Sequence, residues 1–310
     1  MKLKTLLILI LCNLIWSANP AMAKLILNDG ASPMLTAWLR YSSALLAFVM
    51  ISGGRSAFMR PKRGSDWLWV FVIGFMVFFF APALQMTGLH ASHATENALI
   101  VAMEPLITVF LAWLIVGEAL SWVHLLAFAA ALLGFSLLAG LNAMDFSLGG
   151  KEGAHLLGNL LMLGSLLGEA CYSIAGRKLL LRYSPSGIFA TALGIGVFFL
   201  TLTTIISGVR HGVGPVFAPL LSFGPKAWIG VLFVGPLGTA LTYPYWMSAL
   251  QEASIASVAL TLFVQPVFGS VWGTLFLDER LSAAQWTGAA FILTAVVLSM
   301  VAPARLLNKK

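Results

Sequence analysis

Long apolar runs follow one another through almost the whole chain, and they constrain its fold more than any other feature. A helix of about 20 apolar residues crosses the roughly 30 Å hydrocarbon core of a bilayer. Short polar segments separate ten runs of about this length, which predict an all-α membrane protein. The predicted spans are Thr5–Ala23, Pro33–Ser52, Trp67–Leu89, Asn97–Gly117, Leu120–Leu141, Leu156–Ala175, Ser186–Ser207, Ala227–Leu250, Ala253–Leu277 and Ala283–Ala302.

The composition supports lipid as the solvent of much of the surface. Of the 310 residues, 60% are hydrophobic and 9% are charged, whereas a soluble domain has about 25% charged residues. Such a chain lacks the polar residues that would cover a soluble core. A membrane β-barrel is excluded because its strands alternate polar and apolar residues and do not form unbroken apolar runs.

Lysine and arginine residues predict the orientation, since they favour the cytoplasmic side. A cytoplasmic N-terminus places twelve of them inside and five outside, and ten spans then return the C-terminus to the cytoplasm. The inner set is Lys2, Lys4, Arg55, Arg60, Lys62, Arg63, Arg177, Lys178, Arg182, Arg305, Lys309 and Lys310, and the outer set is Lys24, Lys151, Arg210, Lys226 and Arg280.

The first span has a basic start and ends in Ala21-Met22-Ala23, which resembles a cleavable signal peptide. We expect it to be retained as a span. Its loss would leave nine helices and would place the basic C-terminal residues on the outer side.

The two halves of the chain are related by an internal repeat. Residues 84–121 align with residues 245–282 at a constant shift of 161 positions, which superposes Pro105 on Pro266 and Glu118 on Glu279. We therefore predict a first five-helix repeat over residues 5–141, an outer linker over 142–155, a second repeat over 156–302 and a basic cytoplasmic tail over 303–310.

Each repeat holds five spans, an odd number, so the second repeat enters the membrane with inverted polarity. Inverted repeats recur in secondary transporters, where substrate binds near the membrane midplane between the repeats. This architecture favours alternating access to one central site.

The order of several motifs resembles the EamA-type branch of the drug/metabolite transporter superfamily over nearly the whole chain. Trp16, Asn19 and Lys24 match its opening helix, and Pro33 followed by Arg40 resembles its second helix. Pro105 and Pro266 lie in the fourth and ninth spans, each followed by an acidic helix end. Glu104 departs from the pattern, since an uncharged residue is expected there and its repeat partner is Gln265.

This resemblance implies ten helices in two EamA-like repeats. It also implies secondary transport, often export, of amino acids or similar metabolites across the inner (plasma) membrane of a bacterium. The expected partners are a small-molecule substrate, membrane lipid and possible coupling protons, with the protein acting as a monomer or homodimer.

Charged side chains inside a span are costly and usually functional, and Arg40, Glu104 and Glu169 are the three candidates. Arg40 and Glu104 each lie seven residues from the outer end of their span, about 10 Å deep at 1.5 Å per residue. Glu104 is interpreted either as a proton site or contact for a cationic group, or as a structural partner of Arg40. Arg40 could bind a substrate carboxylate or pair with Glu104.

Glu169 lies deeper toward the cytoplasm and shares a helical face with Ser165 and Tyr172. A direct role in transport and an ion pair with Arg177 or Lys178 are both open. The GxxxG pair of Gly164 and Gly168 predicts close helix packing beside it.

Uncharged candidates complete the predicted site. The ninth span carries a polar stripe that suits hydrogen bonding to an organic solute, although bonds between helices would also use it. The eighth span contains prolines and is expected to be kinked. The stripe is Ser254, Ser257, Thr261, Gln265 and Trp272, and the aromatic residues chosen for the cavity are Trp16, Trp38 and Trp246.

Motifs for other functions are missing from the sequence. It has no Walker A motif, dinucleotide-binding glycine pattern, HExxH or nucleophile elbow, so we expect no enzyme activity and no cofactor. His90 and His93 beside Glu96 are interpreted as a solvated loop because no third metal ligand follows at a suitable spacing. A lipid-acting membrane enzyme and a channel or scaffold are the alternative functions.

Overall fold

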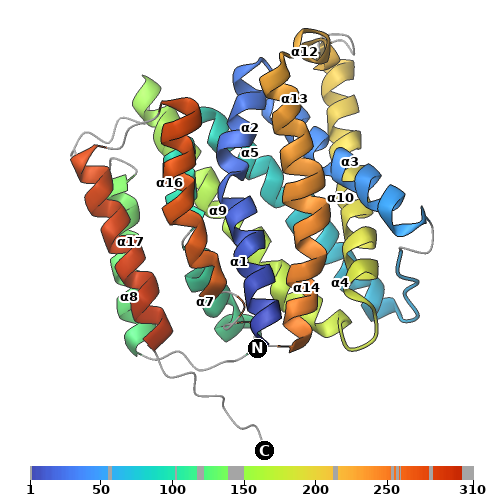
Figure 1. The fold of residues 1–310 in the computed structure, drawn as a ribbon, viewed down its shortest axis with the longest axis horizontal. Helices are drawn as coiled ribbons and strands as arrows, with labels where there is room; N and C mark the ends of the chain where they lie inside the picture. Colours follow the sequence, from blue (N-terminus) through green and yellow to red (C-terminus); the bar gives the residue numbers. More distant parts are fainter. Residues whose placement is uncertain are drawn as a thin grey trace, which may run out of the picture.

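The computed structural model is a bundle of long helices (Figure 1). It describes residues 2–54, 58–101, 103–116, 122–138, 150–211, 216–252, 255, 258, 260–278 and 282–301. All regular secondary structure in these ranges is helical, which confirms the predicted helical class. Glu118, Ser254, Ser257 and Glu279 lie outside the described residues.

In the first half of the chain, several predicted spans consist of more than one helical segment. The segments are α1 (Leu3–Ser17), α2 (Asn19–Asn28), α3 (Pro33–Ser52), α4 (Gly64–Phe75), the π-helix η2 (Met76–Phe80), α5 (Ala81–Ala91), α6 (Ala94–Val101), α7 (Glu104–Val116) and α8 (Trp122–Leu138).

Spans in the second half are also divided into several helical segments. Its segments are α9 (Gly150–Leu179), α10 (Pro185–His211), α12 (Pro219–Ser222), α13 (Pro225–Leu232), the π-helix η3 (Phe233–Leu241), α14 (Thr242–Glu252), the 3₁₀ segment η4 (Leu260–Phe263), α16 (Val264–Leu277) and α17 (Ala283–Val301).

Seven helical stretches of the described residues are long and apolar enough to cross a membrane. They are Leu3–Asn28, Pro33–Ser52, Gly64–Ala91, Glu96–Ile115, Gly153–Leu179, Pro185–Ser207 and Pro225–Glu252. The other three predicted spans coincide with α8, with η4 and α16, and with α17. The chain is therefore a multi-pass membrane protein, whereas the count of ten crossings stays a prediction.

Local sequence sets the ends of α3, which carries Arg40. The side chain of Ser32 accepts a hydrogen bond from the backbone N–H of Leu35 at 3.2 Å, and Pro33 occupies the first turn. Gly53 ends the helix in the left-handed region at φ 78°.

The two π-helices occupy matching positions in the two halves. η2 ends at Phe80 and η3 ends at Leu241, and 241 − 80 is 161, the shift at which the repeats align. Each is embedded between α-helices of one apolar stretch, and Pro236 lies inside η3. The eighth span thus departs from a regular α-helix where its prolines predict a kink.

The helices pack so that the first and second halves interleave. α1 and α6 contact α16, α5 and α7 contact α9, and α3 contacts both η3 and α10. α8 and α17 lie side by side at one edge of the bundle (Figure 1). This arrangement surrounds the centre of the bundle with segments of both halves.

Replacing Gly168 with alanine is expected to destabilise the protein, whereas the same change at Gly164 is not. A Cβ at Gly168 would lie 2.6 Å from the Met76 backbone oxygen of η2, but one at Gly164 would meet only the flexible Leu84 side chain at 3.5 Å. Overpacking costs about 1–3 kcal/mol, while alanine favours a helix by up to about 1 kcal/mol over glycine.

Thermal unfolding of the two purified variants in one detergent tests this packing. The melting temperature should fall for Gly168→Ala and should stay the same or rise for Gly164→Ala. Equal effects of the two changes would show that α9 does not pack on η2 through Gly168.

Candidate functional site

A cavity lies at the centre of the bundle, and both halves of the chain line it. Its volume is about 70 Å³, whereas one water needs roughly 10–15 Å³ on the same scale. It therefore has room for several waters or for part of a small solute. Its lining is Trp16, Asn19, Pro20, Arg40, Gln85, Met86, Leu89, Asn97, Val101, Glu104, Met162, Leu166, Glu169, Tyr172, Ser173, Tyr243, Trp246 and Gln265.

Three helix starts carry polar lining residues, and each has a residue-proline pair in its first turn. Asn19 precedes Pro20 at the start of α2, Glu104 precedes Pro105 at the start of α7, and Gln265 precedes Pro266 in α16. Proline is tolerated at a helix start because its missing N–H has no intrahelical partner there. Each proline therefore interrupts the backbone hydrogen bonding next to one polar side chain of the cavity lining.

Arg40 extends from α3 and is held in place by neutral groups. Its Nε donates to Thr239 Oγ1 at 3.2 Å, one terminal nitrogen donates to Gln85 Oε1 at 3.1 Å, and its guanidinium lies 4.9 Å from the Tyr41 ring centre. The side chain is buried, with 4% of the residue exposed. Since Gln85 and Thr239 come from different halves of the chain, Arg40 bridges the two halves.

The described contacts of Arg40 do not include Glu104. Equal depth in the membrane suggested a structural ion pair between these residues, but no such pair is formed between their charged groups. Both side chains instead line the cavity. The Glu104 carboxylate therefore does not serve as the structural ion-pair partner of Arg40.

Glu169, on α9, is the second carboxylate of the cavity lining. The Tyr243 hydroxyl donates to Glu169 Oε2 at 3.4 Å. Lys178, one of the two partners predicted for Glu169, lies over the Trp69 ring at 3.8 Å. The cavity therefore contains one cationic group and two acidic groups.

Two buried amide groups also face the cavity. The Asn97 Nδ2 group donates to Ser92 Oγ at 2.6 Å and to the His93 backbone oxygen at 2.7 Å. The Oδ1 atoms of Asn19 and Asn97 are buried and accept no hydrogen bond from the described residues. Because an unsatisfied buried acceptor is costly, both atoms are suited to accept a hydrogen bond from a solute or water.

Aromatic rings form one wall of the cavity. Trp16 packs against Tyr243 and Trp246 with ring centres 5.3 Å apart in each pair. The indole N–H of Trp16 donates to the Gly238 backbone oxygen, and that of Trp246 donates to Ser173 Oγ. Their N–H groups are thereby used to position the rings, and an aromatic ring next to a cavity presents an apolar face to a solute.

The cavity lining includes eight residues singled out in the sequence, namely Trp16, Asn19, Arg40, Glu104, Glu169, Tyr172, Trp246 and Gln265, but does not include Thr261 or Trp38. Thr261 Oγ1 accepts from Asn13 Nδ2 at 2.9 Å, and Gln265 Nε2 donates to Asn13 Oδ1 at 2.8 Å, which joins α1 to the ninth span. Trp38 donates to Thr201 Oγ1 and packs on Phe217. Much of the ninth-span stripe thus bonds between helices, as does Trp272, which donates to Ser17 Oγ.

The sequence interpretation omitted Gln85 and Tyr243 from the site and did not consider Asn13. Gln85 and Asn13 are polar residues with apolar neighbours on both sides inside their spans, a signal that could have identified them. Tyr243 belongs to an aromatic patch in which no pattern distinguishes the residue facing the cavity from those facing lipid.

Several known proteins are similar to this chain in sequence. A relative from Archaeoglobus fulgidus named as an uncharacterized transporter is 28% identical over 287 residues, or 90% of this chain and 91% of the relative. A probable amino-acid metabolite efflux pump of Escherichia coli is 24% identical over 288 residues, or 92% and 91%. A probable terminal-alkyne amino-acid exporter of Streptantibioticus cattleyicolor is 24% identical over 205 residues, covering 66% and 63%.

A solved crystal structure shares the fold, with a TM-score of 0.64 and 19% identity over 100% of both chains. The pattern of the EamA-like transporter family matches residues 3–140 and again residues 156–301. These two matches cover most of the chain and confirm the resemblance seen in its motifs. The chain belongs to the EamA-like transporter family.

Proposed function

We propose that this protein is a ten-span secondary transporter that exports amino acids or similar small zwitterionic metabolites by alternating access. In this proposal it lies in the inner membrane with both termini in the cytoplasm. Substrate binds in the central cavity between two inverted five-helix repeats.

The observation that carries the proposal is the presence of both charge signs in one cavity lined by both halves. Arg40 presents a planar set of donors that matches a carboxylate. Glu169 is suited to an ammonium group. A free amino acid carries both groups on one carbon atom and fits this combination.

The names of two relatives support the same substrate class. One is named a probable amino-acid metabolite efflux pump and the other a probable terminal-alkyne amino-acid exporter. The aromatic wall of Trp16, Tyr243 and Trp246 favours a solute that also has an apolar part.

Alternating access needs a site that two units of the protein can expose in turn. Here residues of both halves line the cavity. The hydrogen bonds of Arg40 to Gln85 and Thr239 join the two halves. A substrate carboxylate that takes over one of these bonds would weaken that connection. Substrate binding would thereby lower the cost of moving one half against the other.

Counterflow in proteoliposomes tests the proposed function. Vesicles containing the purified protein are preloaded with one amino acid or small metabolite from a panel, and uptake of the labelled compound is followed. Saturable exchange of one chemical class would establish a carrier and identify that class. Uptake that is equal in empty and preloaded vesicles and does not saturate would instead indicate a channel.

Replacing Glu104 with glutamine is expected to preserve exchange but abolish uptake driven by a pH gradient. Its carboxylate lines the cavity without an ion pair to Arg40, so it is the group we assign to proton coupling. Glutamine has nearly the same size and can still form hydrogen bonds, but its amide group cannot take up and release a proton as a carboxyl group does.

The matched control is Glu252→Gln, because Glu252 lies at the end of α14 with Thr5 and Lys2 and does not line the cavity. It should retain both exchange and pH-driven uptake. A Glu104→Gln protein that behaves like the wild type in both assays would show that Glu104 does not couple transport to protons.

A further inference from the structure

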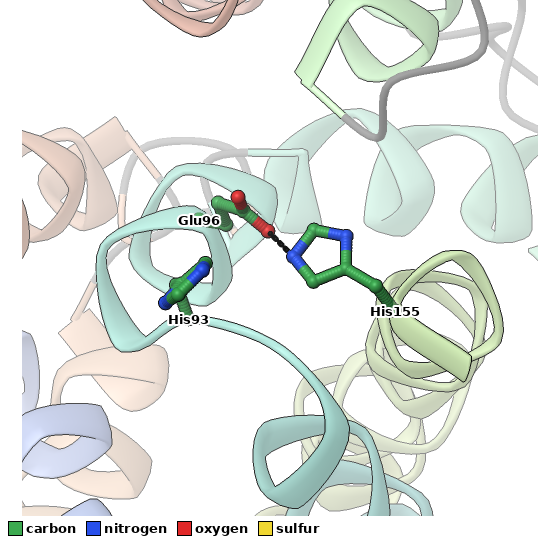
Figure 2. Close-up of side chains that lie close together, drawn as sticks. All are labelled: His93, Glu96 and His155. Carbon is green, nitrogen blue, oxygen red and sulfur yellow. Dashed lines mark ion pairs between the residues drawn. The ribbon is translucent and has the colours of Figure 1, made fainter. Parts of the chain in front are cut away.

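A second polar cluster lies away from the cavity, at the end of the bundle where α5 is followed by α6. It consists of His93, Glu96 and His155, whose ligand atoms all lie within 4.8 Å of one another. Figure 2 shows the His155 ring meeting the Glu96 carboxylate, with His93 on the neighbouring turn of chain. This corrects the expectation of a solvated loop, because Glu96 is fully buried.

Sequence spacing explains two of the three ligands. His93 directly precedes α6 and Glu96 lies in the first turn of that helix, so the chain itself keeps these two ligands close together. His155 comes from the first turns of α9, 155 − 96 or 59 residues later. Only the fold brings this third ligand to the other two, which is why the pattern of the outer loop alone predicted no metal site.

The geometry points to a binding site for a divalent transition metal, and we propose that this metal is Zn²⁺. Zinc binds histidine nitrogen and carboxylate oxygen at about 2.0–2.2 Å in tetrahedral geometry, which separates ligand atoms by roughly 3.4 Å. Glu96 Oε2 and His155 Nε2 are 3.0 Å apart. Small side-chain rotations would therefore bring all three ligands to one ion, and water would fill the fourth position.

A neighbouring amide supports the carboxylate in this role. Asn159 lies one turn after His155 on α9, is fully buried, and donates from Nδ2 to Glu96 Oε2 at 3.1 Å. Ligating carboxylates and histidines are typically oriented by such outer hydrogen bonds. The softer imidazole pair favours zinc over magnesium or calcium, which prefer all-oxygen sites.

A bound ion would join two walls of the central cavity. α6 carries the lining residues Asn97 and Val101, and α9 carries Met162, Leu166 and Glu169. The metal would fix the distance between α6 and α9 at one end of the bundle. This consequence concerns the helices and does not depend on which solute the cavity takes.

Zinc binding to the purified full-length protein tests the proposal. The protein is freed of any polyhistidine tag, stripped with a chelator, and titrated with Zn²⁺ by calorimetry. We expect one ion per chain, and at least tenfold weaker binding for His93→Ala and for His155→Ala. The control is His90→Ala, since exposed His90 is not part of the cluster and should leave the affinity unchanged.

A second measurement separates ligand loss from misfolding. His93 is exposed, so removing its ring should leave the melting temperature of the metal-free protein unchanged. Zn²⁺ should raise the melting temperature of the wild type and of His90→Ala, and of neither cluster variant. The proposal is overturned by a wild type that binds no zinc, or by cluster variants that bind it as tightly as His90→Ala does.

Discussion

Replacing Arg40 with glutamine is expected to lower the efficiency of amino-acid exchange by between about 30-fold and 3,000-fold. Arg40 is the only cationic group that lines the described cavity, and we assign it to the substrate carboxylate. Removing one partner of a buried charged hydrogen-bonded pair costs about 2–5 kcal/mol, and each 1.4 kcal/mol is tenfold. Initial exchange rates over a range of substrate concentrations measure this loss.

A substrate without the carboxylate provides the decisive comparison. The amine obtained by decarboxylating the preferred amino acid should be exchanged poorly by the wild type, and Arg40→Gln should change that rate little. Trp38→Phe serves as the matched control, since Trp38 lies on the same helix but outside the cavity. If Arg40→Gln slows exchange of the amine and the amino acid equally, Arg40 supports the fold and does not read the carboxylate.

Replacing Glu169 with glutamine is expected to have a similarly large effect through the other end of the substrate. Tyr243 positions the Glu169 carboxylate in the cavity that Arg40 also lines, so we assign Glu169 to the substrate ammonium group. The loss in exchange efficiency should again reach at least about 30-fold, because a buried charged partner is removed. The same concentration series measures it.

The deaminated analogue of the substrate, which keeps the carboxylate, separates the possible roles of Glu169. The wild type should discriminate strongly against this analogue, and Glu169→Gln should not. Tyr243→Phe should reduce the discrimination to a smaller extent because it leaves the carboxylate in place. Unchanged discrimination in Glu169→Gln, with a normal melting temperature, would transfer the ammonium role to Glu104 or to the amides.

The sequence contains enough information to predict the helical fold, since a span must satisfy its backbone hydrogen bonds internally. Apolar runs and a shift of 161 positions indicate where helices lie and how the halves correspond. The interruptions are harder to predict. Pro20, Pro105 and Pro266 mark three helix starts, but η2 contains no proline or glycine that would indicate a π-helix.

The candidate site was predictable to the extent that charge in a membrane must face inward. This argument led to Arg40, Glu104 and Glu169, all of which line the cavity. It could not assign their partners, because depth along a helix does not fix the direction in which a side chain points. Arg40 and Glu104 share a predicted depth, yet the hydrogen bonds described for Arg40 go to Gln85 and Thr239.

The positions of the two π-helices bear on how the chain evolved. A π-helix accommodates an extra residue in a regular helix, and η2 and η3 end 161 residues apart, at Phe80 and Leu241. Two independent insertions at one position of two copies would be a coincidence. The simplest history is that an ancestral five-helix gene already carried the insertion when it was duplicated, so the irregularity is older than the two-repeat protein itself.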